Sequence, residues 1–325
     1  MKNKLVVLLT LAVLCMAFCS GCGNVDEPAA VLENPDPASQ VQPPAETVAG
    51  TEAAQTEAVK DKKQAILVVS FGTSYNDSRD LTIGAIENTI AAAFPQYEVR
   101  RAFTSQIIID KLAERDGLLI DNVGEALDRA VADGITTLVV QPTHLMDGYE
   151  YTDLAEELAD YEVQFETVVL GAPLLADDAD FDAVADAIAA HTADYDDGQT
   201  AICFMGHGTE ADANSVYPKL QETLSEKGYD NYYIGTVEAE PSLDDVLAAV
   251  GANGDYTKVV LEPLMVVAGD HATNDMAGDG DDSWKSCFTA AGYEVTCLLE
   301  GLGQNDDICR LYVSHTQDAV DSITE

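Results

Sequence analysis

AILVVSFGTS, at residues 65–74, is a continuous apolar run that ends in a glycine turn, and TAICFMGHGT at residues 200–209 repeats this arrangement. Continuous apolar and β-branched runs are typical of strands that are buried on both faces, as in parallel sheets. Stretches with apolar residues three or four positions apart lie between the runs and indicate helices. The sequence therefore predicts an α/β protein of parallel β/α/β units. The further strand-like runs are at 98–103, 136–141, 164–171, 231–237, 258–264 and 294–299.

The two halves of this pattern resemble each other. A glycine turn follows the first strand of each half, and the third strands lead into QPTHLMDGYEY at 141–151 and EPLMVVAGDHATND at 262–275. We therefore expect two similar α/β domains, at 64–193 and 194–325. Each should hold a four-stranded parallel sheet flanked by helices, and the two should face each other across a cleft.

The first 63 residues have a different composition. Residues 1–22 combine two lysines, an apolar run at 5–18 and the sequence CSGC, which is similar to a bacterial lipobox ending at Cys22. This pattern predicts an exported protein whose lipidated Cys22 anchors it to the outer face of the cell membrane or in the periplasm; ordinary signal cleavage is the alternative. Residues 23–63 are proline-rich and lack aromatic residues, so we expect a disordered tether.

Composition excludes several classes of function. The net charge is −42, which argues against a nucleic-acid partner, because neutralising phosphates requires clustered Lys and Arg. The sequence contains neither a Walker A motif nor a G-x-G-x-x-G motif, so we expect neither ATP nor a nicotinamide cofactor. Buried free thiols, one disulfide and metal ligation are all open interpretations of the remaining cysteines. These are Cys203, Cys287, Cys297 and Cys309.

Three of the five histidines follow strand patterns: His144, His207 and His271. In open α/β sheets, ligands bind outside the carboxyl ends of the strands. Neutral imidazole is also a common metal ligand. These positions therefore predict a metal site in the cleft, where Asp270 or Asn274 would orient the ring of His271.

We expect His207 and His271 to converge, because both end strands of one half. Glu150 should face them from the other half, near a helix N-terminus, with His144 as a further possible ligand. Two imidazoles and one carboxylate suit Co²⁺, Ni²⁺, Fe²⁺ or Zn²⁺ and leave positions open for a substrate. The alternative is that these histidines pack beneath loops or cap turns.

Longer motifs surround the candidate residues. They are ILVVSFGTSYNDSR at 66–79, FPQYEVRRAFTSQIII at 94–109, HLMDGYEY at 144–151, FMGHGTEADA at 204–213, EPLMVVAGDHATNDMAGDGDDSWK at 262–285 and GLGQN at 301–305. In this combination the chain resembles the anaerobic sirohydrochlorin cobaltochelatases, ATP-independent enzymes of cobalamin (corrinoid) biosynthesis. The resemblance extends over the whole body from residue 64 to the C-terminus.

The resemblance implies two α/β domains with a tetrapyrrole between them and the C-terminal helix packing across. It also implies metal-binding and proton-transfer roles for His207, His271 and Glu150. A surface-anchored carrier of haem, another tetrapyrrole or metal, without turnover, is the alternative that the exported N-terminus favours. A homo-oligomer is possible in either case. The candidate substrate contacts are Gly72, Thr73, Ser74, Arg101, Gly208 and Asp270.

Overall fold

The structure is a computed structural model that describes residues 63–323, all of which belong to one compact unit. The predicted signal sequence at 1–22, its Cys22 and all but the last residue of the tether at 23–63 lie outside the described residues. No helix within 63–323 is long and apolar enough to cross a membrane.

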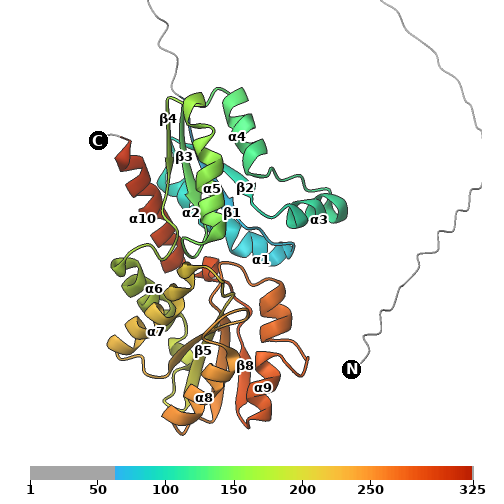
Figure 1. Cartoon of the computed structure of the whole chain (residues 1–325), viewed down its shortest axis with the longest axis vertical. Helices are drawn as coiled ribbons and strands as arrows, with labels where there is room; N and C mark the ends of the chain where they lie inside the picture. The colour runs from blue at the N-terminus through green and yellow to red at the C-terminus, as the bar shows by residue number, and fades with distance from the viewer. Residues whose placement is uncertain (1–62, 324–325) are drawn as a thin grey trace, which may run out of the picture. The chain divides into compact units, whose positions relative to one another are not determined.

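Two four-stranded sheets, parallel throughout, form the centre of the fold (Figure 1). The first has the order β2-β1-β3-β4 and the second the order β6-β5-β7-β8, so the two halves share one topology. This confirms the predicted fold class. The first sheet contains β1 (Gln64–Ser70), β2 (Glu98–Phe103), β3 (Thr137–Pro142) and β4 (Thr167–Leu170), and the second contains β5 (Thr200–Gly206), β6 (Tyr232–Thr236), β7 (Lys258–Pro263) and β8 (Glu294–Cys297).

Helices connect successive strands. A one-turn segment, η1 (Glu162–Gln164), occupies the beginning of the run expected as the fourth strand, so β4 starts only at Thr167. The helices of the first half are α1 (Asn76–Leu81), α2 (Ile83–Ala93), α3 (Gln106–Asp116), α4 (Val123–Ala132), α5 (Tyr149–Ala159) and α6 (Asp178–His191). Those of the second are α7 (Val216–Glu226), α8 (Leu243–Asn253), α9 (Trp284–Ala290) and α10 (Asp306–Ser322), with short turns η2 (Ala193–Tyr195), η3 (Asp212–Ser215), η4 (Ala272–Met276) and η5 (Leu302–Gln304).

Both faces of β1, β3, β5, β6 and β7 are buried, as the continuous apolar runs predict, whereas the edge strands β2, β4 and β8 are only partly buried. Because side chains alternate along a strand, Ile66 and Val68 face one core while Ala65 and Leu67 face another. The first of these cores also contains Ile202 of β5. One apolar cluster therefore extends from the first sheet to the second and couples the two halves.

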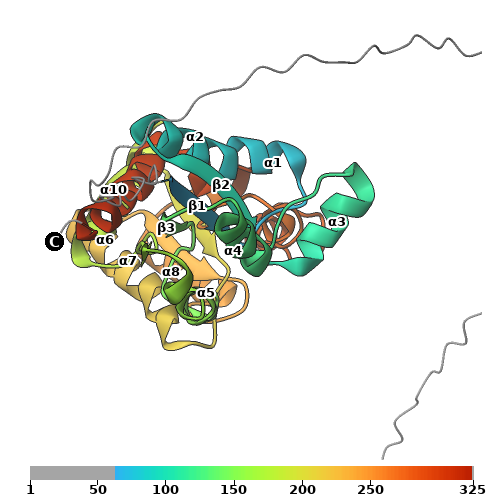
Figure 2. The ribbon, with the colours of Figure 1, turned by 90° about the horizontal axis from the view of Figure 1, so that it is seen from above.

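The last helix of the chain packs against the first sheet, as the family resemblance implies. Tyr312 in α10 donates a hydrogen bond to the carbonyl oxygen of Thr143 at 2.9 Å, and Nε2 of His315 lies 2.8 Å from Oδ1 of Asp180 in α6. Figure 1 shows α10 alongside the first sheet, and Figure 2 shows it beside α6 and α2. The domain boundary at 193/194 stays a prediction.

The sulfur atoms of the four cysteines in the described body are free thiols. Cys203 and Cys309 are buried, and burial raises the pKa of each thiol. The structure therefore agrees with the interpretation as free thiols, not with a disulfide.

Candidate metal centre

His207 lies in a tight turn directly after β5. Gly208 has a φ of 87°, and a Cβ atom on Gly206 would lie 2.2 Å from the ring of Tyr217. The Gly208 N–H donates to the Tyr217 hydroxyl at 3.2 Å. Glycine on both sides therefore allows the turn to close against Tyr217, with the imidazole of His207 48% exposed.

Glu238 lies next to His207 because the pairing of β5 with β6 continues beyond the sheet. The N–H of Val237 donates to the carbonyl oxygen of Gly206, and that of Glu238 donates to the carbonyl oxygen of His207, at 3.0 and 2.9 Å. Oε2 of Glu238 is 3.8 Å from Nδ1 of His207. The backbone thus brings a carboxylate to the histidine from the next strand.

His271 enters the same space from the segment that follows β7. It immediately precedes η4, a single π-helical turn, and its Nδ1 lies 2.7 Å from Oδ2 of Asp275. We predicted Asp270 or Asn274 as the partner of this ring. That prediction is wrong, because Asn274 donates its amide to Asp270 instead, at 3.0 Å.

His207, Glu238 and His271 form one cluster. Their ligand atoms all lie within 4.8 Å of one another, and the imidazole centroids are 4.7 Å apart at 87°. Nδ1 of His207 is 2.9 Å from the carbonyl oxygen of Gly208, and Nδ1 of His271 faces Asp275, so each ring keeps Nε2 as an electron-pair donor. Two imidazoles and a carboxylate suit a first-row divalent metal. The convergence of the two histidines agrees with the prediction from the sequence. The carboxylate within this cluster is Glu238, and metal binding by Glu150 stays a prediction.

Glu150 lies close to this cluster without belonging to it. Partial burial raises the pKa of Glu150; the nearby His207 opposes that rise and Asp153 adds to it. Its Oε2 is 3.4 Å from Nε2 of His144, the other predicted residue. Burial lowers the pKa of His144 to about 4, so this imidazole is neutral at neutral pH. Neither ring nitrogen of His144 has a hydrogen-bond partner among residues 63–323.

A cavity of about 470 Å³ opens beside Glu150. Its walls include the carboxylates of Asp153 and Glu157 and the exposed ring of Phe71. The only charged side chains that line it are acidic, so it suits a cationic or neutral group better than a carboxylate.

The predicted substrate contacts fall into two groups. Thr73 lies near Gly269, and the hydroxyl of Tyr75 donates to Oδ1 of Asp270 at 3.2 Å, so the turns after β1 and β7 meet beside His271. Arg101 is instead paired with Glu87 in α2 through two hydrogen bonds of 2.7 and 2.5 Å. Substrate binding by any of these residues stays a prediction, and for Arg101 it requires that Glu87 release the guanidinium.

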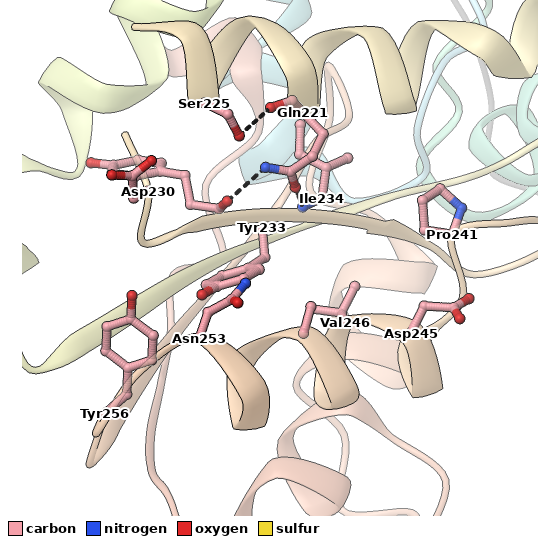
Figure 3. Close-up of a pocket in the computed structure, with 12 residues that line it drawn as sticks. Gln221, Ser225, Asp230, Tyr233, Ile234, Pro241, Asp245, Val246, Asn253 and Tyr256 are labelled. Carbon is pink, nitrogen blue, oxygen red and sulfur yellow. Dashed lines mark hydrogen bonds between the residues drawn. The ribbon is translucent and has the colours of Figure 1, made fainter. Parts of the chain in front are cut away.

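The larger cavity, about 580 Å³, lies elsewhere, along the free edge of β6 between α7 and α8 (Figure 3). Gln221 covers this edge, because its amide accepts a hydrogen bond from the N–H of Ile234 and donates one to the carbonyl oxygen of Tyr232. Neither histidine of the metal cluster lines the cavity, and we assign it no part in the chemistry.

Glu238 and Asp275 are not among the residues predicted from the sequence. Glu238 follows directly after the strand-like run at 231–237, so the rule that drew attention to the histidines at strand ends also applies to it. Asp275 lies four residues after His271, a spacing at which side chains meet on one helical face.

The chain is similar to known proteins over most of its length. The model of a family described as cobalt chelatase (CbiK) matches residues 64–321. The sirohydrochlorin cobaltochelatase of Salmonella typhimurium strain LT2 is 38% identical over 263 residues, covering 81% of this chain and 98% of that protein. The sirohydrochlorin cobaltochelatase CbiKC of Nitratidesulfovibrio vulgaris is 33% identical over 268 residues, covering 81% and 93%.

A solved structure shares the fold. SirB from Bacillus subtilis with Fe³⁺ aligns with a TM-score of 0.59 over 81% of this chain and 98% of that one, at 14% identity. At this identity the likeness supports the two-sheet architecture alone.

Proposed function

The chain belongs to the cobalt chelatase (CbiK) family, and on this premise we propose that it is a sirohydrochlorin cobaltochelatase that inserts Co²⁺ into sirohydrochlorin without ATP. The observation that carries the proposal is the cluster of His207, Glu238 and His271. Its three side chains offer two imidazole nitrogens and one carboxylate beyond the carboxyl ends of adjacent strands. ATP independence is supported by the lack of a Walker A motif in the sequence.

The cluster suits an ion that is bound first and then transferred to the substrate. Two ligands bonded to one ion at about 2.1 Å are at most about 4.2 Å apart, so the three side chains need only small movements to bind Co²⁺. Because His207 and Glu238 are exposed, the ion keeps open positions toward the cleft. The pyrrole nitrogens of the substrate can then replace the protein ligands one at a time.

Insertion also releases two pyrrole protons. As the ion leaves His207 and His271, each freed imidazole nitrogen can accept a proton. Glu150 supplies a further acceptor, because its raised pKa makes it a better base near neutral pH than an ordinary glutamate. The protein therefore provides both a metal donor and proton acceptors.

The test is an anaerobic absorption assay with the tag-free full chain, sirohydrochlorin and Co²⁺. We expect insertion well above the spontaneous rate, and His207→Ala should lower the rate by about 100-fold or more while substrate binding changes little. Glu210→Gln is the matched control, because Glu210 is an exposed acid in the same loop and should leave the rate unchanged.

The same assay tests the carrier alternative. A wild-type chain with no insertion above the spontaneous rate for Co²⁺, Ni²⁺ and Fe²⁺ would refute the enzyme proposal. Haem binding that weakens on His207→Ala would then support a carrier in which His207 is an axial ligand.

We further propose that the protein is exported and anchored through a lipidated Cys22. Support comes from the apolar run at 5–18 and the CSGC sequence that follows it. Cys22→Ser should abolish incorporation of labelled fatty acid and release the protein from the membrane fraction. Retention of label in that variant would refute the anchor.

A further inference from the structure

A second cluster of titratable residues lies outside the metal centre. His191 ends α6, Glu262 is in β7, and Glu300 follows β8. Nε2 of His191 lies 3.4 Å from Oε1 of Glu262 and 3.3 Å from Oε2 of Glu300. One imidazole therefore stands between two carboxylates that come from different parts of the chain.

Glu262 is a buried carboxylate with an oxygen atom that is unpartnered within the described part of the chain. The residue is only 3% exposed, and its Oε2 has no hydrogen-bond partner among residues 63–323. Within residues 63–323, His191 is the only basic residue whose side chain pairs with the Glu262 carboxylate. Burial and the nearby charge of Glu300 raise the pKa of Glu262 to about 8. An uncompensated buried carboxylate is costly, so this position calls for a cation or a proton.

The first half of the molecule shows how a neutral side chain fills the equivalent position. Gln141 precedes a proline at the end of β3, as Glu262 does at the end of β7. The amide of Gln141 donates to the carbonyl oxygens of Pro142 and Ala172 and accepts from the hydroxyl of Thr316 in α10. The second half therefore replaces a satisfied amide with a carboxylate and adds an imidazole and a second carboxylate beside it.

We propose that His191, Glu262 and Glu300 form a second divalent-cation site, distinct from the cluster that handles the substrate metal. Donors about 2.1 Å from a tetrahedral ion are about 3.4 Å apart, which matches both distances from Nε2 of His191. The nitrogen and two carboxylate oxygens suit Zn²⁺ or Co²⁺. The three residues are not yet mutually as close as those of the first cluster. The side chain of Glu300 is 46% exposed, so it would be free to turn toward Glu262 to bind the ion.

An ion at this site would fasten three elements together. His191 is the last residue of α6, and Thr192, the next residue, contacts the hydroxyl of Tyr232 in β6 at 2.9 Å. Bonds from the ion to Glu262 and Glu300 would fix the end of α6 to β7 and to the segment after β8. The expected role is structural, because the ligands are supplied by the protein scaffold and Glu262 is deeply buried.

The experiment counts Zn²⁺ ions on the metal-depleted full chain by titration calorimetry at pH 7.5. The wild type should bind two ions per chain, and the double variant His207→Ala/His271→Ala should bind one. Glu262→Gln should lose the second ion or weaken its binding by at least about 10-fold. It should still fold, because an amide occupies the matching position in the first half.

A thermal shift distinguishes a built site from weak binding to the acidic surface. In the double-variant background, Zn²⁺ should raise the melting temperature, and Glu262→Gln should abolish that rise. Asp279→Asn, which changes an exposed acid that pairs with Lys285, is the matched control and should leave both the ion count and the thermal shift unchanged. A single ion on the wild type, or a second ion that survives Glu262→Gln, overturns the proposal. A missing second ion with insertion activity intact would leave the proposed function standing.

Discussion

Stability should depend on pH through Glu262 when metal is absent. The pKa of this carboxyl is about 8 in the folded protein and near 4.5 when exposed. Between these two pH values the folded chain holds a proton that the unfolded chain has released. The free energy of unfolding therefore falls as pH rises through this window. A difference of about 3.5 pKa units corresponds to about 5 kcal/mol at most, since one unit is about 1.4 kcal/mol.

Glu262→Gln removes the titrating proton and should remove this part of the slope. Urea unfolding of the full chain in EDTA, followed by circular dichroism from pH 5 to 9, measures the effect. The free energy of unfolding of the variant, relative to that of the wild type, should rise by about 1 kcal/mol per pH unit between pH 5 and 8. Glu294 is an exposed acid on the adjacent strand β8. For Glu294→Gln, the plot of unfolding free energy against pH should instead run parallel to that of the wild type. Parallel curves for Glu262→Gln would refute the assignment of a protonated, buried carboxyl.

Three further substitutions separate the roles of neighbouring residues. Glu238→Gln should weaken Co²⁺ binding by at least about 10-fold in calorimetry, whereas Glu150→Gln should preserve Co²⁺ binding and slow insertion by about 100-fold; equal effects on binding would contradict the assignment of Glu238 as the ligand. Asp275→Asn should lower Co²⁺ affinity by about 10–100-fold by releasing the histidine ring that it orients, and unchanged affinity would contradict that role. Gly206→Ala should lower the free energy of unfolding in urea by about 1–3 kcal/mol, because the new methyl group would overlap the ring of Tyr217. An unchanged free energy of unfolding would show that the Tyr217 ring can shift to make room.

Much of the fold follows from patterns that local physics enforces. A strand buried on both faces must be apolar along its whole length, so runs such as 65–71 and 200–205 identify β1 and β5 almost to the residue. The glycines after these strands mark turns where a side chain would clash, as at Gly72 against Phe103. The apolar runs and the glycines that follow them are visible within about ten residues of sequence, although the residue that a side chain would clash with is more distant.

The metal centre follows only in part from local sequence patterns. The strand-end positions of His207 and His271 are visible in the sequence, and so is the expectation that the two converge. The sequence does not show which acid joins the two histidines, because Glu150 and Glu238 both follow predicted strands. The position of Glu238 depends on the pairing of β5 with β6, which continues past the end of both strands and places the carboxylate beside His207.

The remaining features were decided by contacts between distant segments. A glutamate before a proline in β7 carries no sign that it will be buried, nor that the end of α6 and the segment after β8 will bring His191 and Glu300 to it. The packing of α10 against the first sheet and α6 likewise joins residues more than 130 positions apart, such as His315 and Asp180. The sequence alone thus determined the strands, the turns and the two metal-binding histidines that we propose, because each depends on local pattern. The tertiary structure decided which acidic side chains meet them, because a carboxylate is placed by the pairing of strands and helices far away in the chain.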